Sequence, residues 1–427
     1  MINIKYVASQ FNLVIKEDAG KVLVFNTFSG CVCTLEKDVF NSICNNIIDE
    51  KWPYFNDLIS QGIIVLKEID QVGMILQHEN LAKFSNDKKN LSFVIAPTLK
   101  CNLRCYYCFE SSQNDCKVMD EATMQDVLKF IENSFGQETE SLRINWFGGE
   151  PLLAKDFIIK FSKEIKKITD KHNVKYTSSM ITNGVFLTKE TAKNLKQIGE
   201  LQSVQITLDG SKDEYCKRKG TTPVVFEKVI QNICDCADIV RISIRLNCDG
   251  SNYNDILNIV DDLFTNHHLT KKIGVYLAPI TDYNGNGFDV CNNKEFSKLL
   301  IKFNQHLKTT YPDYPLKLDE LNAKKCYCAL KKCINYAIGP NGELYTCEHD
   351  FGVKEFIIGD VKNGEYFTDY HRKFLELKLS EKCKKCKLLP LCLGGCPSMR
   401  YNQKKDVCCI TEPYVKYIIL NKINKSN

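Results

Sequence analysis

Alternating apolar and polar residues open the chain and predict strands over residues 11–15, 22–25 and 31–35, separated by turn residues at 18–20 and 26–30. Apolar residues at helical spacing then predict helices over 38–48 and 55–60, and an apolar strand follows at 63–66. Residues 1–85 are therefore expected to form a small α+β module. A polar linker helix and loop over 70–90 should join it to the rest.

From residue 91 onward, apolar strands alternate with amphipathic helices. The predicted strands cover 91–96, 142–147, 176–181, 204–208, 240–247 and 274–279, and a helix precedes each strand after the first. Strands joined by helices imply right-handed parallel crossovers, so we expect an α/β fold with a partial (β/α)6 barrel of TIM type over 91–285. A connector over 286–325 and a cysteine-rich domain over 326–427 should follow. In such barrels the chemistry lies at the carboxyl ends of the strands.

The composition argues against nucleic-acid and membrane partners and indicates the cellular compartment. The net charge of +5 is too small to argue for a nucleic-acid partner, and no apolar run approaches membrane-spanning length. The first residues lack the apolar core of a signal peptide, so we expect a cytoplasmic protein with no membrane partner. In that reducing compartment, 22 cysteines favour metal binding or catalysis over disulfides.

Cys101, Cys105 and Cys108 follow the first barrel strand in the spacing C-x-x-x-C-x-x-C. Three thiolates can bind three irons of one cuboidal cluster and leave the fourth iron open, whereas four cysteines usually close an electron-carrying cluster. A zinc site is the alternative, but zinc sites usually add a second ligand pair, and only Cys116 lies nearby. The spacing, with aromatic Tyr107 before the last cysteine, resembles that of the radical S-adenosylmethionine (SAM) enzymes.

The same resemblance extends to residues that follow later strands. Gly148, Gly149, Glu150 and Pro151 match the G-G-E-P segment with which that family holds the amino group of SAM. Glycines allow close backbone approach, and the glutamate can accept hydrogen bonds from an ammonium group. The resemblance implies further SAM contacts, with Tyr107 beside the adenine, Thr182, Asn183 and Asp209 near the cofactor, and Arg218 or Arg245 pairing with the carboxylate.

Ten more cysteines lie between Cys326 and Cys409, and their spacing resembles the SPASM domain, which holds two auxiliary 4Fe–4S clusters. By that resemblance, one cluster is held by Cys328, Cys333, Cys347 and Cys396, and the other by Cys383, Cys386, Cys392 and Cys409. Cys326 competes with Cys328, and Cys408 competes with Cys409. Two zinc knuckles are the alternative. Lysines crowd the same region, either as a nucleic-acid patch or, as we favour, to offset thiolate charge.

The resemblance covers residues 91–410 and implies three 4Fe–4S clusters and SAM as cofactors. An electron from the reduced cluster would cleave SAM, and the resulting 5′-deoxyadenosyl radical would take a hydrogen atom from the substrate. The auxiliary clusters would accept the electron released on product formation or bind a substrate thiolate. Glu348 lies where related sulfatase-maturing enzymes carry an acidic residue that takes the substrate's proton, although it could equally be a surface residue.

Residues 1–85 resemble the winged-helix elements that grip leader peptides in ribosomal peptide modification, which bind by adding the peptide as an edge strand. A capping subdomain without a ligand is the alternative. The favoured function is maturation of a ribosomally made, Cys-rich precursor peptide with a leader, forming cross-links such as thioethers, with flavodoxin or ferredoxin as electron donor. The alternatives are an anaerobic sulfatase-maturing enzyme that makes formylglycine and a non-catalytic metal-binding regulator. The 90 residues before the barrel favour the first.

Overall fold

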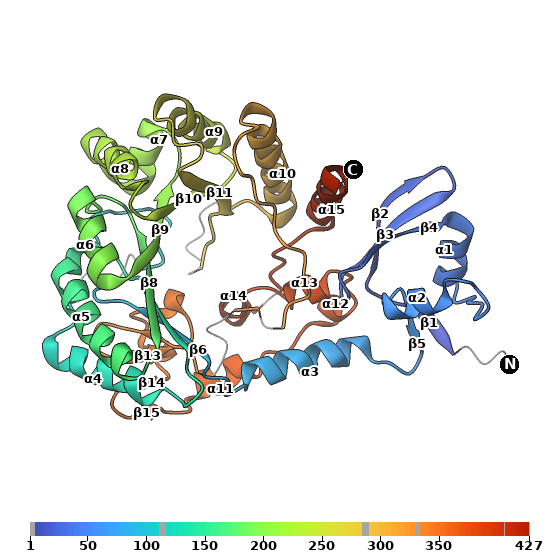
Figure 1. Cartoon of the computed structure of the whole chain (residues 1–427), viewed down its shortest axis with the longest axis horizontal. Coiled ribbons are helices and arrows are strands. Elements are labelled where there is room, and N and C mark those ends of the chain that lie inside the picture. Colours follow the sequence, from blue (N-terminus) through green and yellow to red (C-terminus); the bar gives the residue numbers. More distant parts are fainter. Residues whose placement is uncertain are drawn as a thin grey trace.

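The computed structural model describes residues 5–110, 117–283, 290–325, 327–328, 334–404 and 406–426. Its centre is a curved sheet of ten strands, and the predicted parallel strands form one side of it in sequential order (Figure 1). These strands are β6 (Asn90–Ile95), β7 (Ser141–Trp146), β8 (Lys175–Thr182), β9 (Leu201–Leu208), β10 (Arg241–Cys248) and β11 (Ile273–Pro279). The expected partial barrel is therefore confirmed.

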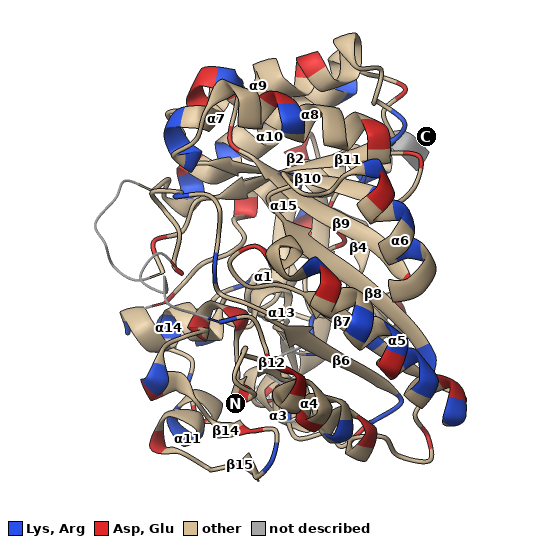
Figure 2. Cartoon of the chain, turned by 90° about the vertical axis from the view of Figure 1, so that its left-hand side faces the viewer, with Lys and Arg blue, Asp and Glu red and all other residues tan. Residues whose placement is uncertain are grey.

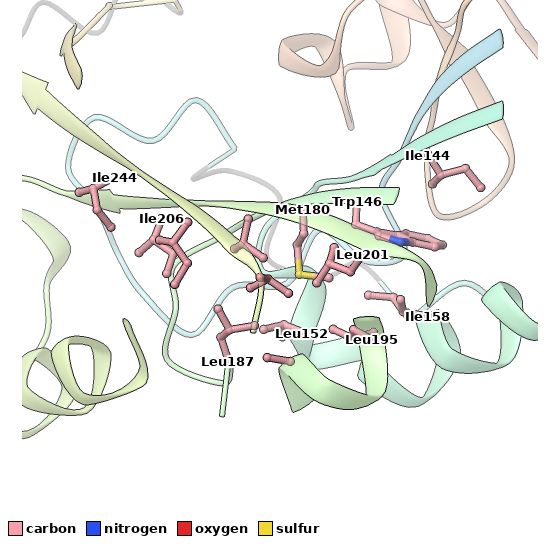
Figure 3. Close-up of a cluster of buried hydrophobic side chains, with 14 of the residues drawn as sticks. Ile144, Trp146, Leu152, Ile158, Met180, Leu187, Leu195, Leu201, Ile206 and Ile244 are labelled. Carbon is pink, nitrogen blue, oxygen red and sulfur yellow. The ribbon is translucent and has the colours of Figure 1, made fainter. Parts of the chain in front are cut away.

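Helices cover the outer face of this sheet (Figure 1). They are α4 (Glu121–Asn133), α5 (Lys155–Lys171), α6 (Lys189–Gly199), α8 (Pro223–Cys236) and α9 (Tyr253–Asp261), which continues as the π-helix η2 (Asp262–Asn266). Figure 3 shows Trp146 and Met180 of the strands meeting Ile158 and Leu195 of the helices. Each side chain buried in this way stabilises the fold by about 1.5–3 kcal/mol.

One helix near the site was not predicted. α7 (Lys212–Lys219) follows β9 and has no apolar period, because its sequence is almost entirely polar. Acidic residues lie in its first turn and three basic residues in its last, which complements the helix dipole. The helix ends at Gly220, whose φ of +58° suits glycine.

The cysteine-rich part joins the barrel through main-chain hydrogen bonds. β12 (Ala337–Ile338) pairs in parallel with Val94 and Ile95 of β6, and β13 (Glu343–Tyr345), β14 (Gly359–Asp360) and β15 (Gly364–Glu365) extend the sheet in antiparallel order. The surrounding helices are α10 (Asn293–Thr310), η4 (Glu348–Asp350), η5 (Lys354–Phe356), α11 (Asp369–Leu375), α12 (Glu381–Lys384), α13 (Leu389–Cys392), α14 (Pro397–Gln403) and α15 (Glu412–Ser426). This sheet extension was not predicted.

The N-terminal module lies at the far end of the molecule from α5 and α6 (Figure 1). It contains an antiparallel sheet of β2 (Asn12–Asp18), β3 (Lys21–Asn26) and β4 (Val32–Glu36), the helices α1 (Lys37–Cys44) and α2 (Phe55–Ser60), and a pair formed by β1 (Tyr6–Ala8) and β5 (Ile64–Leu66). α1 ends before the predicted residue 48, and Asn46 has a φ of +56°. α3 (Gln71–Lys83) then leads to the barrel.

Basic and acidic residues are interspersed on the outer helices (Figure 2). No helix in the described part of the chain combines the length and apolar character that crossing a bilayer requires.

Candidate active site

The loop that carries Cys101, Cys105 and Cys108 follows β6 and lies on the end of α7. Arg104 N donates to the carbonyl of Lys219 at 3.0 Å, and Tyr106 N donates to that of Arg218 at 3.3 Å. The three thiols are half-buried. Burial raises the pKa of Cys101 to about 11 and that of Cys108 to about 12, so metal binding there must release protons.

The hydroxyl of Tyr107 lies in a buried polar network at the ends of β9 and β10. It donates to Asp209 Oδ2 at 2.6 Å and accepts from Lys219 Nζ at 2.6 Å and from Asn247 Nδ2 at 3.0 Å. Lys219 and Asp209 form an ion pair at 3.2 Å, and Asp209 is fully buried. Two residues predicted to contact SAM, Tyr107 of the cysteine loop and Asp209 after β9, are thus hydrogen-bonded to each other.

Tyr106 is held in a similar way by Arg218. Its hydroxyl donates to Asp249 Oδ2 at 2.9 Å and accepts from Arg218 Nη1 at 2.9 Å. The five N–H donors of Arg218 are all used, by Glu214, Tyr106, Ser251 and both oxygens of Asp249. Arg218 therefore has no donor left for a SAM carboxylate. Of the two candidate arginines, the geometry favours half-buried Arg245, whose Nε donates to Asn247 Oδ1 at 2.8 Å.

The two glycines of the G-G-E-P segment allow one loop to approach another closely. A Cβ at Gly148 would lie 2.3 Å from the carbonyl oxygen of Thr98, and one at Gly149 would lie 2.4 Å from that of Lys100. Glu150 N donates to the carbonyl of Lys100 at 2.8 Å. The sequence interpretation assigned the close approach to a ligand, whereas the structure shows that it brings the segment against the residues preceding Cys101.

Glu150 connects this segment to the residues after β8. Its Oε1 accepts from Leu152 N at 2.9 Å and from Thr182 Oγ1 at 2.7 Å, and its Oε2 accepts from Asn183 N at 2.8 Å. Pro151 begins the short helix η1 (Pro151–Ala154). Full burial raises the pKa of Glu150 to about 7, despite these hydrogen bonds. Asn183 Nδ2 in turn donates to Asn102 Oδ1 at 2.8 Å, so these predicted residues meet at the start of the cysteine loop.

The second cysteine field faces the first across a set of aromatic rings. Cys347 follows β13, and Cys347, Glu348 and His349 have potential ligand atoms within 4.8 Å of one another. The His349 ring stacks on Tyr283 at 4.1 Å and lies 4.5 Å from the ring of Phe109, which follows Cys108. Burial lowers the pKa of His349 to about 4 and raises that of Glu348, so neither group is in its usual titration range.

Not all predicted ligands of this field are described. Cys333, and Cys326 as the competitor of Cys328, lie outside the described residues. Cys328 is half-buried and packs against the cluster that contains Val94 and Tyr345. Burial raises the pKa of Cys347, and nearby Cys396 adds a smaller effect in the same direction.

Four other cysteines surround one cavity. Cys383, Cys386, Cys392 and Cys408 line it together with Leu388 and Leu389. Cys409 does not line this cavity and hydrogen-bonds instead to Cys392 and Tyr327. Cys408 lines the cavity and Cys409 contacts Cys392 of the same set, so both stay candidates for its fourth residue. Side chains of adjacent residues in an extended segment point to opposite sides, so Cys408 and Cys409 face different surroundings.

Residues 95–263, from the end of β6 into η2, match the radical SAM superfamily. The chain contains a radical SAM domain. It is therefore a radical SAM enzyme, and the half-buried thiols of the cysteine loop fit the iron–sulfur cluster of that family.

Curated proteins similar to this radical SAM enzyme include sulfatase-maturating enzymes and GTP 3′,8-cyclases. A cysteine-type anaerobic sulfatase-maturating enzyme of Clostridium novyi is 27% identical over 349 residues, which span 72% of this chain and 88% of that relative. The solved structure of native anSMEcpe with bound AdoMet and Cp18Cys peptide matches with 21% identity and a TM-score of 0.58, over 79% of this chain and all of that one. Streptococcus suis SuiB bound to precursor peptide SuiA matches with 15% identity and a TM-score of 0.52, over 92% of this chain and 95% of that one. The two structural matches share the fold.

Sequence reasoning missed three residues of the radical SAM domain that fix the cysteine loop: Tyr106, Lys219 and Asp249. No local pattern marks them, because their partners lie far away in the sequence. It also missed Glu110, a buried carboxyl whose Oε1 has no hydrogen-bond partner within the described residues. Burial raises the pKa of Glu110 to about 8.

Replacing Arg218 with methionine should lower the free energy of unfolding by about 3–5 kcal/mol, because it removes the buried guanidinium that pairs with the largely buried carboxylates of Asp249 and Glu214. The urea midpoint measures this loss. Lys217→Met is the control, since the neighbouring Lys217 side chain is 80% exposed, and we expect a change within about 0.5 kcal/mol. Equal urea midpoints for the two variants would contradict a stabilising role of Arg218.

Proposed function

We propose that this radical SAM enzyme modifies a ribosomally synthesised, Cys-rich precursor peptide and forms an intramolecular cross-link such as a thioether. The observation that carries the proposal is the N-terminal module. The likeness to SuiB, solved with its precursor peptide, spans 92% of this chain, against 79% for anSMEcpe. The additional span is consistent with a module that serves a leader-bearing peptide substrate.

We assign three 4Fe–4S clusters to the chain. Cys101, Cys105 and Cys108 would hold the SAM-binding cluster, with Gly148–Pro151, Thr182, Asn183 and Arg245 around SAM. Cys328, Cys333, Cys347 and Cys396 would hold the first auxiliary cluster, and Cys383, Cys386, Cys392 and either Cys409 or Cys408 the second. When bound, the SAM-binding cluster and SAM supply a carbon radical that removes a hydrogen atom from the substrate. An acidic one-electron carrier such as flavodoxin or ferredoxin would deliver the electron.

The protein's own contribution is position, exclusion of water and proton transfer. The aromatic rings of Phe109, Tyr283 and His349 line the region between the cysteine loop and Cys347 and limit water there. Glu348 Oε2 lies 4.0 Å from Cys347 Sγ, at the edge of this region. Because burial raises its pKa, Glu348 is suited to take a proton from the substrate.

The leader would bind along the outer edge of β4. Asn26 N donates to the carbonyl of Cys31, and Lys37 N donates to that of Gly20, so the odd-numbered residues of β4 turn their backbone groups toward β3. The N–H and C=O groups of Val32 and Thr34 consequently point outward. β4 is the last strand of its sheet in the described structure, which leaves this edge available for an added strand.

Thr34→Pro should weaken binding of a leader peptide at least about tenfold, because it removes one outward N–H donor and leaves the ladder with β3 intact. Titration of the protein with a fluorescent leader peptide measures the Kd. Thr34→Val keeps the N–H and should bind like the parent. Leader binding that is identical in both variants would exclude the β4 edge.

Sulfatase maturation is the second candidate, favoured by the similarity to the Clostridium novyi enzyme over 88% of that relative. Mass spectrometry of a Cys-containing peptide, after incubation with SAM and dithionite, separates the two. A thioether removes two hydrogens and keeps the sulfur, whereas formylglycine loses it. A leader that raises turnover supports peptide maturation, and equal turnover of a short leaderless Cys peptide to formylglycine would overturn it.

A further inference from the structure

The N-terminal module contacts the loop that carries Cys383 and Cys386. Gln10 Nε2 donates to the carbonyl of Lys384 at 3.3 Å, and Thr27 Oγ1 donates to the carbonyl of Lys387 at 2.5 Å. Lys384 and Lys387 are the residues that directly follow the two cysteines. The module therefore fixes the main chain immediately after each of these thiols.

Apolar packing joins the same two parts. Cys383 belongs to a buried cluster with Phe11 and Ile75 from the N-terminal side, and Phe11 is fully buried. Cys386 packs against a second cluster that contains Leu13 and Phe25. The module's internal core, which includes Ile43 and Leu58, is a separate cluster. Changes in that core can therefore be separated from changes at the contact with the cysteine loop.

The other side of this cysteine loop lines the cavity described above. Cys383 and Cys386 thus lie between the module on one side and the cavity on the other. Ser380 Oγ, which accepts from Cys383 N at 3.1 Å, and Asp406, which accepts from Ser380 at 2.6 Å, are within the cysteine-rich part itself. Further support for the loop comes from a segment more than 350 residues earlier in the chain.

We infer that the N-terminal module completes the second auxiliary cluster site, with Phe11 and Thr27 as positioning residues for the Cys383–Cys386 loop. The inference rests on the proposed function, which assigns a cluster to this cavity. Groups that orient metal ligands typically change metal affinity 10- to 100-fold when they are removed. The N-terminal module would then both bind the leader peptide and position ligands of the metal centre.

The experiment uses the full chain with Cys101, Cys105 and Cys108 replaced by alanine, so that the auxiliary clusters alone contribute iron. Thr27→Val removes the hydroxyl donor to Lys387, and Thr27→Ser restores it. Leu58→Ala is the matched control in the module's internal core. Each anaerobically reconstituted variant is assayed for iron content, for the electron paramagnetic resonance spectrum after reduction, and for the rate of iron release to a chelator.

We expect the parent to hold about eight irons and to release them in two phases. Thr27→Val should accelerate one phase about 10- to 100-fold and change one of the two resonance signals, while Thr27→Ser and Leu58→Ala release iron like the parent. Phe11→Ala should lose about half of the iron. Parent-like release from Thr27→Val, or equal acceleration by Leu58→Ala, would overturn the inference. A parent that binds only zinc, or half the expected iron, would instead contradict the three-cluster assignment.

Discussion

Replacing Cys105 with alanine should abolish the formation of 5′-deoxyadenosine from SAM and lower the iron content by about four atoms per chain. Three thiolates are the minimum that holds a cuboidal cluster with one open iron, and the loop offers no fourth cysteine within the described residues. The main chain on both sides of Cys105 is held by the contacts of Arg104 and Tyr106 to the end of α7. The measurement is chromatography of an anaerobic reaction with SAM and dithionite.

Cys234→Ala is the control for this variant. Cys234 is half-buried on the outer helix α8 and contacts His267, away from every predicted cluster site. It should leave both iron content and SAM cleavage unchanged. Undiminished 5′-deoxyadenosine from Cys105→Ala would contradict the assigned cluster.

Glu348→Gln should slow product formation about 10²- to 10⁴-fold while 5′-deoxyadenosine continues to form. The amide has nearly the same shape but accepts no proton at neutral pH. Because burial raises the pKa of Glu348, its carboxylate form grows as the pH rises through that raised pKa. Product formation by the parent should therefore increase over this range, and the variant should lose the increase. Simultaneous assays of product and 5′-deoxyadenosine against pH measure both effects.

The control is Glu355→Gln, an exposed carboxylate in the nearby helix η5. It should retain the activity and pH profile of the parent. If Glu348→Gln also formed product at the parent's rate, Glu348 would have no catalytic role. If it lost SAM cleavage as well, the residue would be needed for the structure of the site.

The barrel and the positions of its motifs could be predicted because both depend on local patterns. Most of its strands alternate buried apolar residues with polar ones, and every candidate motif follows a strand, so the carboxyl ends bring them together. The strands β12–β15 have two or three residues each, too few to show a period. The polar helix α7 lacks the apolar stripe by which a helix is found.

The details of the site depend on contacts between distant residues. Nothing in the spacing of the sequence shows that Arg218 is fully occupied by Glu214 and Asp249, or that Tyr107 shares Asp209 with Lys219. The choice between Cys408 and Cys409 is of the same kind, because a difference of one residue reverses the direction of the side chain. A sequence pattern identifies such residues as candidates, and only the packing distinguishes them.

The pairing of β12 with β6 has a consequence for the products. β6 leads into the loop of Cys101, and β12 leads through β13 to Cys347, so both sides of the reaction region belong to one hydrogen-bonded sheet. Under the proposed function, this sheet sets the distance between the attacked carbon and the bound sulfur of the substrate. That distance stays constant from one substrate to the next. Peptides of different sequence should then give rings of one size.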